Sequence, residues 1–122
     1  MPISHILIKA TAAEYPTVVT FYDQVLKTIG LQKLPGFPEG MTAFGVNGPE
    51  LVVAIGPVNT QVHVAFNAPN ETAVNAFHTE AISAGAKDNG APGRRAHIHP
   101  NYHAAFVLDP IGNNIEAACI VA

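Results

Sequence analysis

Two histidines and one glutamate stand out as side chains that could do chemistry together. His5 and His63 each lie in a short apolar stretch typical of a strand, and Glu116 interrupts the apolar stretch 114–121. A carboxylate inside an apolar strand is costly to bury unless it has a partner. Two imidazoles and a carboxylate form the ligand set of a facial triad, which leaves open positions on a metal for substrate, oxygen or water. These residues therefore predict a site for one divalent metal ion, and the ligand set suits Fe, Mn, Zn, Ni and Co alike.

A second group of polar side chains precedes the last two strands, in the segment RRAHIHPNYH at 94–103. His99 and Tyr102 are candidate proton donors, at a rim that would bind an anionic or phenolic substrate. Alternation along the strand from Phe106 predicts that Tyr102 lies on the same face as Ala104 and that His103 lies on the opposite face. The alternative interpretation of this segment is a solvated loop.

Hydrophobic periodicity predicts the elements that would position these side chains. Apolar residues recur at helical spacing over 14–29 and over 71–84, and Gly30 and Gly85 end these helices. Short strands are predicted on both sides of each helix, with a hairpin around Asn47-Gly48, a strand near 86–89 and a Gly- and Pro-rich loop at 89–95. A closing hairpin joins 102–108 to 114–121 through the turn residues 109–113.

The predicted elements follow the order βαβββ twice, with a break at 56–59. Module one spans 1–56 and module two spans 60–122, and together they make one domain. His5 and His63 occupy the same place in each copy, whereas the counterpart of Glu116 is Val52. The pattern predicts an α+β fold in which two βαβββ modules form a curved, cup-shaped mixed sheet with the helices outside. The strand face turned away from the helices, here called the cup face, would carry His5, His63 and Glu116 by alternation.

Composition excludes several classes of protein. The chain has 122 residues, a net charge of −3 and only six Lys and Arg residues, so nucleic acid is not an expected partner. No run approaches the ~18 apolar residues of a membrane helix, and the first residues lack a signal-peptide pattern, which favours a cytoplasmic protein. A single cysteine, Cys119, excludes an internal disulfide.

The βαβββ repeat, the strand-borne His5 and His63, and the segments FYDQVLKTIGL at 21–31 and DPIGNNIE at 109–116 resemble the vicinal oxygen chelate superfamily. This superfamily contains glyoxalases, bleomycin-resistance proteins and extradiol dioxygenases, and the resemblance covers essentially the whole chain. It implies one divalent metal held by the first strand of each module and the last strand of the chain, which here means His5, His63 and Glu116. Members of the superfamily also include binding proteins without metal.

The resemblance leaves the branch of the superfamily open. Glyoxalase I commonly has a fourth ligand at the position of Val52 or Val53, and Glu50 is expected in the nearby turn. Extradiol dioxygenases are similar in the D-P-x-G-x-x-x-E pattern, but Phe106 replaces their tyrosine. Fosfomycin-resistance thiol transferases usually have a hydroxyl where this chain has Leu7.

We therefore expect a metal-dependent lyase or oxidoreductase that acts on a small-molecule substrate with vicinal oxygens, by isomerase, dioxygenase or thiol-transfer chemistry. The alternative is a non-catalytic binding protein of the bleomycin-resistance type that sequesters a small hydrophobic or drug-like ligand. A third interpretation is a scaffold whose His-His-Glu set is vestigial. The high apolar content predicts a homodimer, and so does the resemblance, because members of the superfamily often form pairs.

Overall fold

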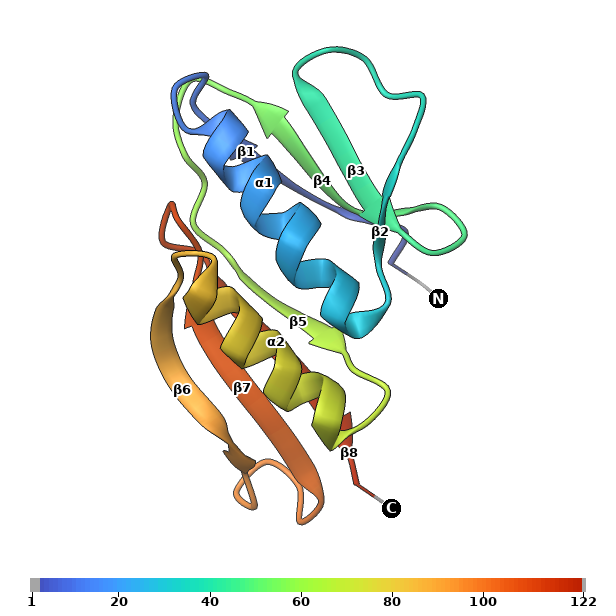
Figure 1. The fold of residues 1–122 in the computed structure, drawn as a ribbon, viewed down its shortest axis with the longest axis vertical. Helices are drawn as coiled ribbons and strands as arrows, with labels where there is room; N and C mark the ends of the chain where they lie inside the picture. The colour runs from blue at the N-terminus through green and yellow to red at the C-terminus, as the bar shows by residue number, and fades with distance from the viewer. Residues whose placement is uncertain (1–2, 122) are drawn as a thin grey trace.

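The computed structural model describes residues 3–121 and contains two copies of a βαβββ unit (Figure 1). The elements of the first unit are β1 (Ile6–Ala10), α1 (Tyr15–Val25), the 3₁₀ turn η1 (Leu26–Ile29), β2 (Gln32–Leu34), β3 (Met41–Gly45) and β4 (Pro49–Ile55). Those of the second are β5 (His63–Asn67), α2 (Glu71–Ser83), β6 (Lys87–Arg94), β7 (Tyr102–Leu108) and β8 (Asn114–Ile120). The predicted α+β repeat is confirmed.

Hydrogen bonds between the strands define two mixed sheets of four, in the orders β1-β4-β3-β2 and β5-β8-β7-β6. The first strand of each unit runs parallel to the last strand of that unit, and the other neighbours are antiparallel. Within the described residues, the eight strands therefore divide at β1 and β5 and do not form one continuous hydrogen-bonded ladder. The linker begins against module one, where Gly56 N–H donates to the carbonyl of Ala10 over 2.9 Å and Thr60 N–H donates to that of Lys9 over 3.0 Å.

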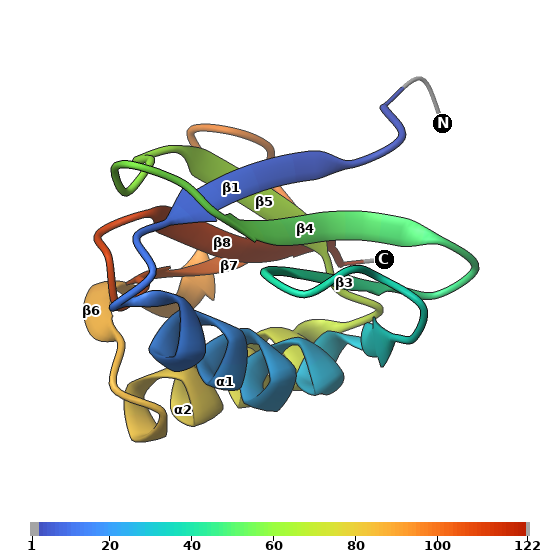
Figure 2. The same cartoon turned by 90° about the horizontal axis from the view of Figure 1, so that it is seen from above.

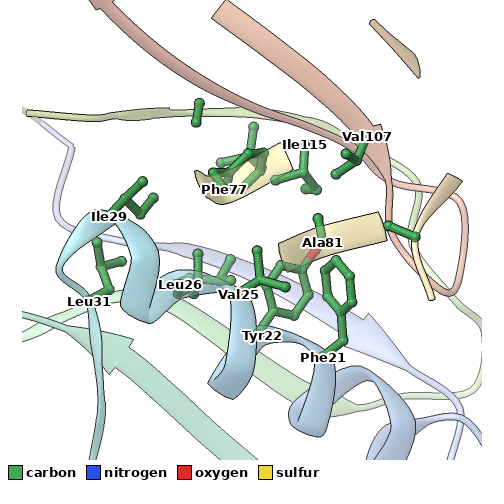
Figure 3. Packing of buried hydrophobic residues seen from close by; sticks show 14 of the residues in the cluster. Phe21, Tyr22, Val25, Leu26, Ile29, Leu31, Phe77, Ala81, Val107 and Ile115 are labelled. Atoms are coloured by element: carbon green, nitrogen blue, oxygen red, sulfur yellow. The ribbon is translucent and has the colours of Figure 1, made fainter. Parts of the chain in front are cut away.

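Both helices lie on the same side of the two sheets, so the opposite strand face is free of helices (Figure 2). The helices share one hydrophobic core with the sheets. Figure 3 shows Phe21, Tyr22 and Val25 from α1 packed near Phe77 and Ala81 from α2. Strand residues such as Ile115 and Val107 close this core from the sheet side. The shared core fixes the two modules against each other and leaves the cup face available for a site.

A buried carboxylate links the two modules through the turn between β7 and β8. Asp109 Oδ1 accepts hydrogen bonds from the backbone N–H groups of Ile111 and Asn113, at 3.0 and 2.8 Å. Asp109 Oδ2 accepts from Asn113 Nδ2 at 2.8 Å and from the hydroxyl of Tyr22 on α1 at 2.5 Å. Gly112 completes the turn with a φ of +91°, a conformation that glycine adopts at little cost. The DPIGNN segment therefore has a structural role: Asp109 fixes the conformation of the turn and also holds α1 against it.

Three local details differ from the sequence-based expectations. The helical segment 14–29 divides into α1 and the 3₁₀ turn η1, which ends at Gly30 with a φ of +92°. The Asn47-Gly48 hairpin forms, but neither residue has a positive φ, because a three-residue loop at 46–48 and a bulge at Phe44/Gly45 replace a tight two-residue turn. Strand β6 continues to residue 94, whereas the Gly- and Pro-rich segment 89–95 had suggested a loop. As an edge strand it tolerates Pro92 and two register shifts.

Candidate functional site

Glu116 forms the centre of a polar cluster on the cup face. Its side chain is only 5% exposed, and its Oε1 atom lies 3.1 Å from Nε2 of His63. Its Oε2 atom accepts a hydrogen bond from the hydroxyl of Tyr102 over 2.5 Å. Both carboxylate oxygens therefore have a partner, which offsets the cost of burying the charge. The cluster joins three of the residues that the sequence singled out.

Strand register explains why these three side chains meet. Ala65 on β5 pairs with Glu116 on β8, so His63, two residues earlier on β5, shares the cup face and reaches the carboxylate diagonally. Phe106 on β7 pairs with Glu116 from the other side. Ala104 and Ala118 pair with each other between Glu116 and Tyr102, and their small side chains leave room for the Tyr102 ring to reach back.

On the helix-facing side of β7, the His103 side chain also has defined partners. The His103 ring lies 3.0 Å from Asn75 Oδ1 on α2 and 3.6 Å from Glu71 Oε1, measured from its Nε2 and Nδ1 atoms respectively. The predicted alternation, with Tyr102 on the cup face and His103 facing away, is confirmed. His103 therefore belongs to the packing of α2 and not to the candidate site.

The structure places His5 near this cluster without bringing it into the cluster. His5 is exposed just before β1, and Ser4 is its hydrogen-bond neighbour, with Oγ 3.1 Å from Nδ1. His5 and His63 both line one hollow of about 380 Å³, formed mainly by residues 3–6 and 63–67. Within residues 3–121, no group of three or more His, Cys, Asp or Glu side chains lies close enough to hold a metal ion. The donor chemistry of His5, His63 and Glu116 suits a divalent metal, but only His63 and Glu116 are already in contact.

The repeat itself accounts for the separation of His5 from Glu116. In module one, Leu7 pairs with Val52 as Ala65 pairs with Glu116 in module two. His5 therefore lies diagonal to Val52, in a different sheet from Glu116. The predicted equivalence of Val52 and Glu116 is confirmed by this register. At the Val52 position module one offers no oxygen or nitrogen side-chain donor.

Two further residues lie elsewhere than the sequence suggested. Glu50 belongs to strand β4 and lines the hollow with both histidines, whereas a position in the turn was expected. Its Oε2 atom accepts a hydrogen bond from Val46 N–H over 3.1 Å. His99 lies in the exposed turn that follows β6, where its Nδ1 accepts a hydrogen bond from the backbone N–H of Asn101 over 3.0 Å. Of the two candidate proton donors, only Tyr102 contacts Glu116.

Burial and charge change the acidity of Tyr102. Burial raises the pKa of its hydroxyl to about 12, and the hydrogen bond to Glu116 and the negative charge of that carboxylate act in the same direction. Tyr102 therefore remains a neutral donor at physiological pH and satisfies one oxygen of Glu116.

An aromatic and cationic stack adjoins the cluster, and sequence reasoning had assigned it no role. The rings of His63 and Phe106 are stacked, with centroids 6.2 Å apart and an interplanar angle of 19°. The guanidinium carbon of Arg95 lies 5.4 Å from the Phe106 ring centroid. The guanidinium does not pair with Glu116, whose partners are His63 and Tyr102.

No protein-family model matches the sequence, and a search of curated proteins finds no match. Solved structures do match over nearly the full chain. A glyoxalase/bleomycin resistance protein from Albidiferax ferrireducens T118 is similar with a TM-score of 0.81 at 21% identity, covering 97% of this chain and 98% of that one. The chain has the vicinal oxygen chelate fold.

Two other vicinal oxygen chelate structures show the same likeness. A glyoxalase/bleomycin resistance protein/dioxygenase family enzyme from Burkholderia phytofirmans PsJN has a TM-score of 0.74 at 17% identity, covering 97% of this chain and 98% of that one. Lactoylglutathione lyase from Agrobacterium tumefaciens has a TM-score of 0.65 at 18% identity, covering 95% and 91%. Enzymes are thus among the proteins that share this vicinal oxygen chelate fold.

Within residues 3–121, neither helix has the length and apolar character that crossing a bilayer requires.

Proposed function

We propose that this chain is a metal-dependent enzyme, a lyase or oxidoreductase, whose cup face binds a small molecule with vicinal oxygens. The observation that carries the proposal is the buried carboxylate of Glu116, with His63 3.1 Å away on the parallel neighbouring strand. A buried carboxylate in contact with a half-exposed imidazole, with small side chains around them, favours a site open to a ligand over a purely structural contact. Ala65 and Ala118 provide the surrounding space on the cup face.

In this proposal His63 and Glu116 supply two donors to one divalent metal, and His5, across the same hollow, supplies the third. The side chain of His5 is exposed and therefore free to turn toward the hollow. Once bound, the metal would act as a Lewis acid on the two neighbouring oxygens of the substrate. Tyr102 holds its proton on the hydroxyl beside Glu116 Oε2 and orients that carboxylate.

The same face of the chain also forms the homodimer that we propose, because Leu7 and Ile120 expose 42% and 58% of their surface there.

A second candidate function is a metal-free binding protein that sequesters a small hydrophobic molecule. One observation favours it: both oxygens of Glu116 already have partners within the chain, so the site is satisfied without an ion. In that case the cluster would be a fixed polar floor under a ligand, and Glu116 would have no chemical role.

Metal binding separates the two candidate functions when it is measured on protein that has been stripped with a chelator and then titrated with metal. We expect one Mn²⁺ or Zn²⁺ per chain by calorimetry and elemental analysis. Glu116→Gln and His63→Ala should weaken binding by roughly tenfold or more, and His5→Ala should also weaken it. His97→Ala, in the exposed loop before β7, is the matched control and should bind like the wild type. Absence of stoichiometric metal, or equal binding by Glu116→Gln, would favour the metal-free binding protein.

A further inference from the structure

Two consecutive arginines, one at the end of β6 and one directly after it, have opposite surroundings. Arg94 lies on the helix side, where its Nη2 atom is 3.7 Å from Glu71 Oε2 on α2. Arg95 lies on the cup side, and no described carboxylate forms an ion pair with it. Within residues 3–121, its side chain makes one hydrogen bond, from Nη2 to the carbonyl of Ala91 over 2.8 Å. Because a guanidinium has five N–H donors, most of the hydrogen-bonding capacity of Arg95 remains for a ligand.

The side chain of Arg95 is held in place although no carboxylate of residues 3–121 serves as its counter-ion. Its guanidinium carbon lies 5.4 Å from the centroid of the Phe106 ring, a favourable cation–aromatic contact. Gly90 and Gly93 make the space for this arrangement. A Cβ atom on Gly90 would lie 2.9 Å from Phe106 and 3.2 Å from Arg95 Nη2, and one on Gly93 would lie 3.1 Å from Arg95 Nη1. Both glycines therefore form a cradle that any larger residue would fill.

This arginine is continuous with the candidate site. Its backbone N–H donates to the carbonyl of Tyr102 over 2.7 Å, which makes Arg95, directly after β6, a neighbour of Tyr102 on β7. Phe106 contacts Arg95 and stacks on the His63 ring, which in turn contacts Glu116. The cup face of module two thus carries a row of planar groups that begins with an unpaired cation and ends at the His63–Glu116 pair.

We propose that Arg95 is a specificity-determining residue that binds a carboxylate on the ligand of this site. The planar fork of a guanidinium matches a carboxylate bidentately, and the Phe106 ring reduces the freedom that Arg95 would lose on binding. The ligand class is a small planar acid whose flat body lies along Phe106 and His63. This inference rests on the proposed site, because it assumes that the cup face takes a small molecule, but it does not require the metal.

The test compares benzoate with its neutral isostere benzamide, in protein freed of metal by a chelator. Titrations followed by ¹⁵N NMR should show tighter binding of benzoate, on the order of tenfold, with a shift of the Arg95 Nε–Hε resonance. Arg95→Gln should abolish the preference for benzoate. Arg95→Lys should keep part of it, because the charge remains while the planar fork is lost. Arg94→Gln, the neighbour on the helix side, is the matched control and should keep the preference.

Equal binding of both compounds, or a preference that survives Arg95→Gln, would overturn the proposal. Loss of the preference in Arg94→Gln would do so too, because it would indicate a general charge effect. A second titration, with catechol and 3,4-dihydroxybenzoate in metal-loaded protein, separates this inference from the proposed function. If catechol does not bind while benzoate is still preferred through Arg95, the vicinal-oxygen function fails and the carboxylate site stands. If catechol binds and the added carboxylate gives no gain, the carboxylate site fails alone.

Discussion

The hydroxyl of Tyr22 on α1 donates a hydrogen bond to Asp109 Oδ2, in the last turn of module two, over 2.5 Å. The two residues are far apart in the sequence, and both are buried. The same carboxylate organises the turn between β7 and β8 through Ile111 and Asn113. One contact therefore connects the helix of the first module to the hairpin that carries Glu116, which makes this pair a determinant of how the site is presented.

Tyr22→Phe should destabilise the fold, because it removes one donor from a buried carboxylate. We expect a loss of about 1–3 kcal/mol in the free energy of unfolding, measured by urea denaturation. Tyr15→Phe is the matched control. Its hydroxyl contacts Thr42 Oγ1 at 2.6 Å in a partly buried place with a neutral partner, so its loss should cost about 0.5–1.5 kcal/mol. If Tyr15→Phe lowers the free energy of unfolding more than Tyr22→Phe does, the hydrogen bond between Tyr22 and Asp109 is not a main contributor to stability.

The same pair predicts a dependence of stability on alkaline pH. Burial, together with the charge of Asp109 and the hydrogen bond to it, raises the pKa of Tyr22 well above its ordinary value of 10.0. The unfolded chain then loses this proton first, so the stabilisation is complete below pH ~10 and decreases above it, by about 1.4 kcal/mol per pH unit. Tyr22→Phe should show a correspondingly shallower decline in urea titrations above pH ~10. Parallel curves for the two proteins would contradict the raised pKa.

Tyr102→Phe and Glu116→Gln should differ in their effect on stability. The first leaves a carboxylate that is 5% exposed without its hydroxyl donor, at a cost of about 1–3 kcal/mol. The second keeps the volume and the hydrogen-bonding capacity and removes the buried charge, so it should be nearly neutral in metal-free protein. Thermal and urea unfolding of both variants would measure this. A larger loss for Glu116→Gln would mean that the charge itself stabilises the cluster through His63.

Gly90→Ala should disturb the Phe106–Arg95 stack. The added Cβ atom would lie 2.9 Å from Phe106 Cδ1, so the ring must shift. We expect a loss of about 1–3 kcal/mol of stability and a change in the ring resonances of Phe106. Gly85→Ala is the matched control, because Gly90 and Gly85 both have a positive φ, +156° and +102°, but a Cβ atom on Gly85 meets nothing within 4 Å. An equal effect of the two substitutions would argue against a crowded cradle.

The proposed homodimer should depend on the cup face. Ile120 exposes 58% of its surface beside Tyr102, so Ile120→Lys should shift the sedimentation coefficient toward that of the monomer at micromolar concentration. Ile82→Lys is the matched control, because Ile82 is also exposed, at 40%, but lies on α2. A wild-type protein that sediments only as a monomer would contradict the dimer. Equal effects of both lysines would place the contact elsewhere.

The sequence by itself determined the repeat and the face on which each strand residue lies. Alternation placed His63, Tyr102 and Glu116 on the cup face and His103 on the helix face, because successive strand residues point to opposite sides whatever the neighbours are. Helical periodicity and the glycines at 30 and 85 located both helices, and the register confirmed the equivalence of Val52 and Glu116.

Only the tertiary structure decided which of these residues meet. Contact between His63 and Glu116 follows from the parallel pairing of β5 with β8, and the position of His5 follows from the division of the strands into two sheets. The strand predicted near 86–89 forms, but its continuation to residue 94 was missed, because an edge strand tolerates Gly and Pro that local propensity assigns to loops. The Arg95–Phe106–His63 stack needs the register of all four strands of the module-two sheet and two glycines without side chains, and no local pattern in the sequence encodes such a non-local arrangement.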